Sequence, residues 1–305
     1  MTSEETKLKN IATAKDIKAD MTIDYLDDDI IMFDNVRLLT TANSARLNMN
    51  AIAFCNKGKA QLELNGTPVL FDENHVMICP PNTNFDNLML SPDFDFKAIF
   101  MTDRILMSFL RDKMNVWTEL LFVHKMHVIP ISKSDVNFLR YFYEILNMEI
   151  QNQHENPYKT EVVQSFLRGA ILGLCGNLKI RMQQAEESMP THTRIPTVLN
   201  SSQHIFQQFI SLLSATPQKH RPVDYYATEL CITPKYLSSI CKKQSGKTAN
   251  EWIKEHVLED IRYHLKQTNH SIKQICSILG FPNPSFFGKY VKDHFGVTPA
   301  QLRRQ

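Results

Sequence analysis

Short stretches of alternating apolar and polar residues fill the chain from about Thr22 to Val128, with turn signals between them. Asn65 and Gly66 separate two such stretches, and this pair favours a type I′ hairpin turn, which needs positive φ at both central residues. The pattern predicts an antiparallel β barrel or sandwich. The predicted strands include residues 51–55, 60–64, 68–71 and 75–79. The apolar residues expected to face the barrel as core, rather than to line a pocket, are Ile52, Phe54, Leu62 and Leu64.

The hydrophobic period changes after the barrel, and residues 135–153 and 159–184 show the spacing of two helices. An apolar stripe on the second helix comprises Val162, Val163, Phe166, Leu167, Ile171, Leu174 and Leu178. Two interpretations of this stripe stay open. It either packs on the barrel or pairs with a second copy of the chain in a homodimer.

Residues 185–198 have no apolar period and contain Pro190 and Pro196, which interrupt helices. A chain of 305 residues suits two domains. We therefore expect an α+β protein with a sensor and dimerisation domain at residues 1–184, a linker at 185–198, and an all-helical domain at 199–305.

The C-terminal part repeats itself at an offset of 50 residues. Each copy reads as a short helix, a tight turn and a second helix, which is the plan of a helix-turn-helix unit. The short helices are expected at 223–230 and 271–279, and the complete units at about 223–244 and 271–294. The matching pairs are Tyr236-Leu237 with Phe286-Phe287, Lys242 with Lys292, Gly246 with Gly296, and Thr248 with Thr298.

Capping signals mark where the second helix of each unit begins. Thr233 can cap the first, and Pro234 then occupies a position where a missing N–H has no cost. Asn283, also before a proline, repeats this arrangement. We place Leu230 and Gly280 at equivalent positions before the turn, because glycine permits the backbone to join two helices steeply.

The second helix of such a unit fits the DNA major groove with its N-terminal side chains at the base edges. Tyr236, Leu237, Ile240 and Cys241 are expected on the inner side of the first. Lysines suit phosphates or guanine acceptors, and small residues allow close approach. The candidate DNA-binding residues are Thr233, Pro234, Lys235, Ser238, Ser239 and Lys242 in the first unit, and Asn283, Ser285, Gly288, Lys289 and Lys292 in the second.

A long helix predicted at residues 251–266 joins the two units. It would span about 24 Å, so it can hold the two recognition helices about one DNA turn apart, for a bipartite site. From Leu199 onward the chain has 14 Lys and Arg against 7 Asp and Glu, whereas the preceding part is net negative. This favours double-stranded DNA as the partner, although a solvated charged surface has the same composition.

The C-terminal sequence resembles the AraC/XylS family of bacterial-type transcription regulators, over about residues 199–303. The segments that carry the resemblance are 225–238, 242–246, 271–281, 285–287 and 295–299. Ser239 and Lys289 stand where the family usually has arginine, Cys241 and Val291 where it has phenylalanine, and Asn283 where it has aspartate. Base preferences are therefore not transferable, because lysine and serine lack the bidentate geometry of arginine.

The resemblance also implies an N-terminal cupin-like barrel, helices that dimerise, a small-molecule effector in the barrel, and RNA polymerase as a further partner. A cupin enzyme fused to a DNA-binding module is the leading alternative, since such barrels hold metals with clustered histidines. Here the strands offer His75, and His124 and His127 would point to opposite faces of an expected strand. We therefore expect neither enzyme activity, catalytic residues, metal nor cofactor.

An architectural DNA-binding protein without sequence preference is the other alternative. The two expected DNA-reading helices and the separate barrel argue against it.

The polar N-terminus lacks the apolar core of a signal peptide, and no segment reaches 18 uninterrupted apolar residues. The six cysteines form no C-x-x-C pair, so we expect reduced thiols in a cytoplasmic protein without a membrane segment.

Overall fold

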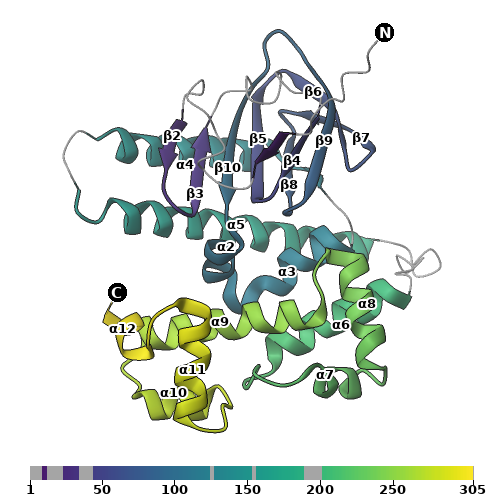
Figure 1. Cartoon of the computed structure of the whole chain (residues 1–305). Helices are drawn as coiled ribbons and strands as arrows, with labels where there is room; N and C mark the ends of the chain where they lie inside the picture. The colour runs from purple at the N-terminus through teal and green to yellow at the C-terminus, as the bar shows by residue number, and fades with distance from the viewer. Residues whose placement is uncertain are drawn as a thin grey trace, which may run out of the picture. The chain divides into compact units, whose positions relative to one another are not determined.

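The computed structural model describes residues 9–11, 23–33, 44–123, 127–152, 156–188 and 201–304 (Figure 1). Two compact units are present, and each takes residues from both halves of the sequence. The first comprises residues 1–109 and 126–176, and the second comprises 110–125 and 177–305. Helix α5 continues to Ser188, into the predicted linker at 185–198, and residues 189–200 lie outside the described part, so the linker stays a prediction.

Two sheets make up the β part of the first unit, as the fold class predicted. One contains, in spatial order, β1 (Lys9–Ile11), β4 (Ser44–Leu47), β9 (Thr83–Leu90), β6 (Lys59–Leu64) and β7 (Thr67–Asp72). The other contains β11 (Val128–Pro130), β8 (His75–Cys79), β5 (Asn50–Lys57), β10 (Asp95–Met101), β3 (Ile30–Phe33) and β2 (Ile23–Leu26). All described pairings are antiparallel except that of β1 with β4.

The hairpin between β6 and β7 confirms the turn prediction. Asn65 and Gly66 have φ of 51° and 78°, and Leu64 pairs with Thr67 on either side of them. Positive φ at both central residues is the requirement of a type I′ turn, whose twist matches that of the flanking strands. The sequence therefore sets the register of this hairpin locally.

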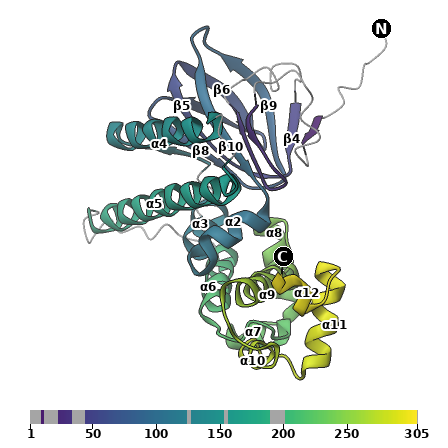
Figure 2. The same cartoon turned by 90° about the vertical axis from the view of Figure 1, so that its left-hand side faces the viewer.

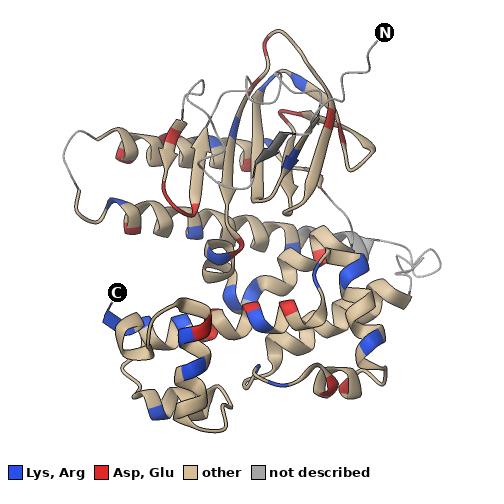
Figure 3. Cartoon of the chain, in the orientation of Figure 1, with Lys and Arg blue, Asp and Glu red and all other residues tan. Residues whose placement is uncertain are grey.

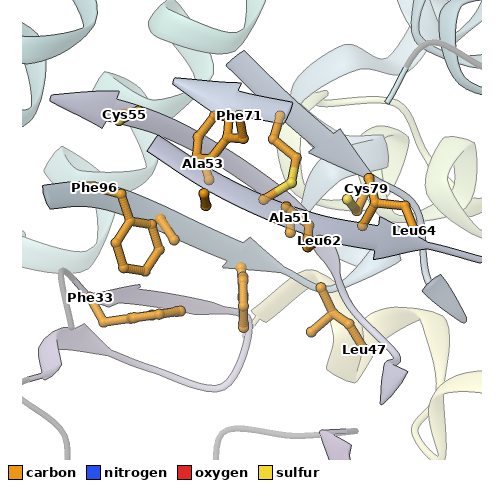
Figure 4. Packing of buried hydrophobic residues seen from close by; sticks show 14 of the residues in the cluster. Phe33, Leu47, Ala51, Ala53, Cys55, Leu62, Leu64, Phe71, Cys79 and Phe96 are labelled. Atoms are coloured by element: carbon orange, nitrogen blue, oxygen red, sulfur yellow. The ribbon is translucent and has the colours of Figure 1, made fainter. Parts of the chain in front are cut away.

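The core of the first unit lies between the two sheets and is built from strand positions of period two (Figure 4). Leu62 and Leu64 belong to it, as predicted, together with an edge-to-face pair of Phe33 and Phe100 whose ring centroids are 4.8 Å apart. Ile52 and Phe54 are buried but do not belong to this cluster, because Ala51, Ala53 and Cys55 take the inward positions of β5. The ring of Phe54 packs instead on Tyr143 of α4, so the predicted orientation of these two residues was wrong.

Two long helices, α4 (Lys133–Gln151) and α5 (Lys159–Ser188), follow the strands as predicted and lie side by side (Figures 1 and 2). A reciprocal hydrogen-bonded pair of Ser132 and Asp135 caps the start of α4. Much of the α5 stripe is buried, including Val163, Leu167 and Ile171, whereas Phe166 is exposed. The choice between packing on the barrel and pairing with a second copy stays a prediction.

Residues 103–123 are helical, which contradicts the prediction of β structure throughout 22–128. They form α2 (Asp103–Leu110), a 3₁₀ turn (Arg111–Lys113), α3 (Met114–Thr118) and the π-helical η3 (Glu119–Val123). Thr102 Oγ1 accepts the N–H of Ile105 at the start of α2, and apolar residues then recur at helical spacing. The local signals were present, but the surrounding strand pattern hid them.

The second unit consists of helices, and the segment from residue 110 to 125 is part of it. Helix α3 packs on α6 (Ser201–Ala215), and the ring of Phe122 lies 6.2 Å from Phe206 and 6.1 Å from Trp252. Gln207 donates a hydrogen bond of 2.6 Å to Glu119. The remaining helices are α7 (Val223–Glu229), α8 (Pro234–Ser245), α9 (Ala249–Gln267), α10 (Ile272–Ile278), α11 (Pro284–Phe295) and α12 (Pro299–Arg304). No described helix is long and apolar enough to span a membrane.

Candidate DNA-binding surface

Helices α8 and α11 begin at the predicted capping residues. The Thr233 side chain accepts the N–H of Tyr236 at 3.2 Å, and the Asn283 side chain accepts that of Phe286 at 2.8 Å. A proline occupies the first helical position in both. Each cap satisfies a backbone donor that the helix itself leaves unpaired, so the start of each recognition helix is determined locally.

In the turns that precede these two helices, the equivalent residues differ from those predicted. Cys231 and Gly280 hold the left-handed conformation, with φ of 55° and 77°, whereas Leu230 has φ of −91°. Gly280 is therefore equivalent to Cys231 and not to Leu230. The second turn is one residue longer, so the offset between the units is 49 residues before the turn and 50 after it.

The residues that repeat after α8 and α11, the two candidate recognition helices, end these helices and start the next ones. Gly246 and Gly296 terminate them in the left-handed conformation, with φ of 77° and 73°. Thr248 and Glu251 then form a reciprocal capping box at the start of α9. Thr298 forms the same pair of hydrogen bonds with Gln301 at the start of α12. The repeated residues are therefore mostly those that start and stop helices.

Helix α9 joins the two units and is buried along one side. It has 19 residues, a length of about 28 Å. The helix predicted at 251–266 is confirmed, and its buried residues include Trp252, Ile253, Val257, Ile261 and Leu265. The inner faces of the recognition helices are also closed, by Leu237, Ile240 and Cys241 on α8 and by Phe287 and Val291 on α11. Cys241 and Val291, where the family usually has phenylalanine, are fully buried core residues.

The predicted DNA-binding residues are exposed or partly buried. Figure 3 shows Lys and Arg segments along α11. Pro234, Ser238 and Gly288 are partly buried. The exposed members are Thr233, Lys235, Ser239, Lys242, Asn283, Ser285, Lys289 and Lys292. This arrangement leaves two lysine-bearing faces available for a polyanion, and the individual DNA contacts stay a prediction.

One aromatic residue, Tyr236, was assigned to the wrong side. Tyr236, predicted on the inner face of α8, and its repeat equivalent Phe286 are each 46% exposed. Adjacent helical positions differ by 100°, so two neighbouring apolar residues need not face the core equally. Leu237 and Phe287 take the core position, which leaves Tyr236 and Phe286 beside the candidate DNA-facing residues as surface groups that sequence reasoning missed.

Several basic residues of the second unit have structural partners instead. Lys219 Nζ lies 3.0 Å from Asp260, and the Arg111 guanidinium lies over the Tyr263 ring at 3.3 Å. Arg303 donates a hydrogen bond of 3.3 Å to the carbonyl oxygen of Leu265, near the C-terminal end of α9. The basic excess of this unit is therefore only partly available for DNA.

Of the histidines weighed as metal ligands, His75 and His127 are among the described residues. His75 Nδ1 lies 2.7 Å from Asp72, and His124 lies outside the described residues. Of the strand expected around His124 and His127, residues 121–123 are helical, whereas β11 begins at Val128. Within the described ranges, no cluster of three or more His, Cys, Asp or Glu side chains could hold a metal ion.

His256, buried on α9, makes the stability of the second unit depend on pH. Burial, followed by the charges of Lys219 and Lys247, lowers the pKa of His256 from 6.5 to about 3. Above about pH 6.5 the imidazole is neutral in both the folded and the unfolded protein. Below that pH the imidazole binds a proton in the unfolded chain but stays neutral in the folded protein. The free energy of unfolding therefore decreases as the pH falls from 6.5 toward 3.

We therefore expect the free energy of unfolding to fall between pH 7 and 5 by about 2 kcal/mol more in the wild type than in His256→Leu. Urea unfolding followed by tryptophan fluorescence at both pH values measures this difference. Equal losses in the two proteins would contradict the assignment to His256.

A helix-turn-helix domain model matches residues 226–305. The regulator ArgR of Pseudomonas aeruginosa is 28% identical over 127 residues, which is 42% of this chain and 37% of that protein. The regulatory protein PocR of Salmonella typhimurium is 27% identical over 169 residues, or 53% of this chain and 54% of that protein. The matches thus span about half or less of these relatives.

Two solved structures also match this chain. An AraC-type DNA-binding protein from Chromobacterium violaceum is 28% identical, with 34% of this chain and 93% of that one covered and a TM-score of 0.30. ToxT from Vibrio cholerae is 15% identical, with 92% and 96% covered and a TM-score of 0.33. The sequence matches therefore carry the family assignment.

Proposed function

This chain belongs to the AraC/XylS family, and we propose that it is a DNA-binding transcription regulator that recognises a bipartite DNA site through α8 and α11. The single observation that supports this is the repeated geometry. Two helices with the same caps, the same buried face and lysines on the exposed face are joined by one helix of 19 residues. Such an arrangement suits two successive major grooves on one face of DNA.

The candidate residues divide by chemistry. Lys235, Lys242, Lys289 and Lys292 supply positive charge for phosphates or guanine acceptors. Ser238, Ser239 and Ser285 offer hydroxyl groups, and Gly288 allows close approach of the backbone. The exposed rings of Tyr236 and Phe286 add apolar surface that suits the methyl group of thymine.

Selection of bound duplexes from a random-sequence library, with the full chain at near-physiological salt, tests this function. We expect enrichment of two sequence blocks about 10 base pairs apart. Binding without an enriched motif that collapses as salt is added would favour the architectural alternative, because phosphate contacts alone depend steeply on salt. Absence of binding would contradict the proposal for the chain in its unliganded state.

Lys289→Ala is expected to lower affinity for the selected duplex at least fivefold, since one direct contact is worth about 1–3 kcal/mol. Lys289 is exposed on α11, so the free energy of unfolding should not change. Lys266→Ala is the matched control, because Lys266 is also an exposed lysine but belongs to the last turn of α9. Fluorescence anisotropy with labelled duplex measures both, and equal affinities would remove Lys289 from the contact residues.

Control by a small-molecule effector in the β unit and contact with RNA polymerase complete the proposed function, which is regulatory rather than enzymatic. The observation that favours a sensor is the separate β unit with a core of its own between two sheets. A compound that raises the Tm of the full chain and also changes its affinity for the selected duplex would support this. Stabilising compounds that leave the affinity unchanged would contradict it.

We also propose that the first unit forms a homodimer through α4. Four large apolar side chains on this helix are strongly exposed, namely Phe138, Tyr141, Ile145 and Met148. Their three-, four- and three-residue spacing places them on one face, and a second copy of the same helix would cover it. Tyr141→Glu combined with Met148→Glu should convert dimer to monomer in sedimentation analysis, whereas Lys133→Glu, at an exposed position in the first turn of α4, should not. A monomeric wild type would contradict the proposal.

A further inference from the structure

The loop between α6 and α7, residues 216–222, reaches from the first helix-turn-helix unit to the second. It is held at its base by hydrogen bonds of its own unit. Thr216 Oγ1 donates to the carbonyl of Leu212 at 2.7 Å, and the Tyr226 hydroxyl donates to the carbonyl of Lys219 at 3.0 Å. Lys219 Nζ also donates to Asp260 of α9 at 3.0 Å, so the middle of the loop has a defined position.

His220, one residue further along this loop, stacks on the second helix-turn-helix unit. Its ring lies 4.0 Å from that of Phe281, at an interplanar angle of 21°. Tyr290 of α11 contacts the same ring edge-on, with centroids 5.3 Å apart. Burial lowers the pKa of His220, so the stacked ring is neutral at physiological pH. Phe281 belongs to the turn that immediately precedes α11, and thus the contact lies at the base of the recognition helix.

A second contact of the loop meets the same turn. A Cβ added at Gly280 would lie 3.1 Å from Cβ of Gln218, which is tighter than ordinary van der Waals contact. Gly280 also needs its positive φ of 77°. The absence of a side chain at this position therefore serves both the turn and the close approach of the loop.

We propose that residues 216–222 form a clamp that sets the position of α11 relative to α8, with His220 as its positioning residue. The clamp rests on the proposed function, since its consequence is a fixed spacing between the two DNA blocks. Helix α9 is the covalent connection between the two helix-turn-helix units, and it could still bend between them. Stacking of His220 and the contact at Gly280 add a separate connection between the units and remove that freedom.

Duplex selection with His220→Ala in the full chain tests the consequence for DNA. We expect the same two sequence blocks as in the wild type, but with their separation varying by about one base pair, or roughly 3.4 Å. His220→Phe retains a stacked ring and should keep the wild-type spacing. His294→Ala is the matched control, because His294 stacks on Tyr290 within α11 itself and connects no two units. A merely destabilising change would weaken binding without changing the spacing.

Amide hydrogen exchange tests the clamp independently of DNA. His220→Ala should speed exchange of the α10–α11 turn and the first turn of α11 roughly 3- to 10-fold, the value of one lost aromatic contact. His220→Phe and His294→Ala should leave these amides at the wild-type rate, and so should α8 in all three variants. Faster exchange without any selected motif in the wild type would support the clamp and contradict the proposed function. Unchanged exchange in His220→Ala, or unchanged spacing with a selected motif, would overturn the clamp.

Discussion

Phe287→Ala is expected to lower the free energy of unfolding of the second unit by about 3–5 kcal/mol, the range for removal of a buried phenylalanine ring. The side chain is fully buried on α11, and its ring packs edge-to-face on Phe281 with centroids 5.0 Å apart. Truncation would leave a cavity at the centre of a small helical unit. Urea unfolding followed by tryptophan fluorescence reports this change, because Trp117 and Trp252 both belong to the second unit.

The neighbouring Phe286→Ala is the matched control. The chemistry of the substitution is identical, but Phe286 is 46% exposed, so the loss should stay below about 1 kcal/mol. A similar loss for both variants would show that exposure does not separate the two rings. In that case the assignment of Phe287 to the core and Phe286 to the surface would be wrong.

Trp117→Ala is expected to destabilise the second unit by a similar 3–5 kcal/mol, although Trp117 precedes the helix-turn-helix region by about a hundred residues. Its indole is 2% exposed on α3, the short helix that packs on α6. Removal would open the core that residues 110–125 share with the helical unit. Trp252 remains as the fluorescent reporter in this variant, and its ring lies 6.1 Å from those of Phe122 and Phe206.

Tyr158→Ala serves as the control for this experiment, because it removes an aromatic side chain that is 67% exposed in the first unit. It should leave unfolding reported by tryptophan fluorescence unchanged. If Trp117→Ala also left the urea midpoint unchanged, the segment from 110 to 125 would contribute nothing to the stability of the second unit.

The features that sequence predicted well are those that depend on a few neighbouring residues. Thr233 and Asn283 cap helices through their own side chains, and Asn65-Gly66 adopts the backbone conformation that its turn needs. The repeat was detectable because the same caps and glycine stops recur at fixed positions. The candidate DNA-facing residues were chosen from the same local pattern, since a capped helix of known start has a calculable outward face, and their contacts with DNA stay a prediction.

The errors concern residues whose environment is supplied from elsewhere in the chain. Ile52 and Phe54 face away from the β core because small residues occupy the inward positions of β5. The assignment of Tyr236 to the inner side failed for a related reason, since hydrophobic character does not say which of two adjacent residues meets a partner. The shift of the turn from Leu230 to Cys231 required the backbone, because a single inserted residue changes the equivalence without leaving a hydrophobic signal.

Local propensity and hydrophobic period therefore determined the kind of protein this is: strands first, helices after them, and two capped helix-turn-helix units at the end. Only the tertiary structure decided that residues 110–125 complete the core of the helical unit and that the loop at 216–222 reaches the second recognition helix. The physical reason is the range of the interactions. A cap or turn is satisfied within about four residues, whereas burial of Trp117 or stacking of His220 depends on partners that folding brings from distant parts of the chain.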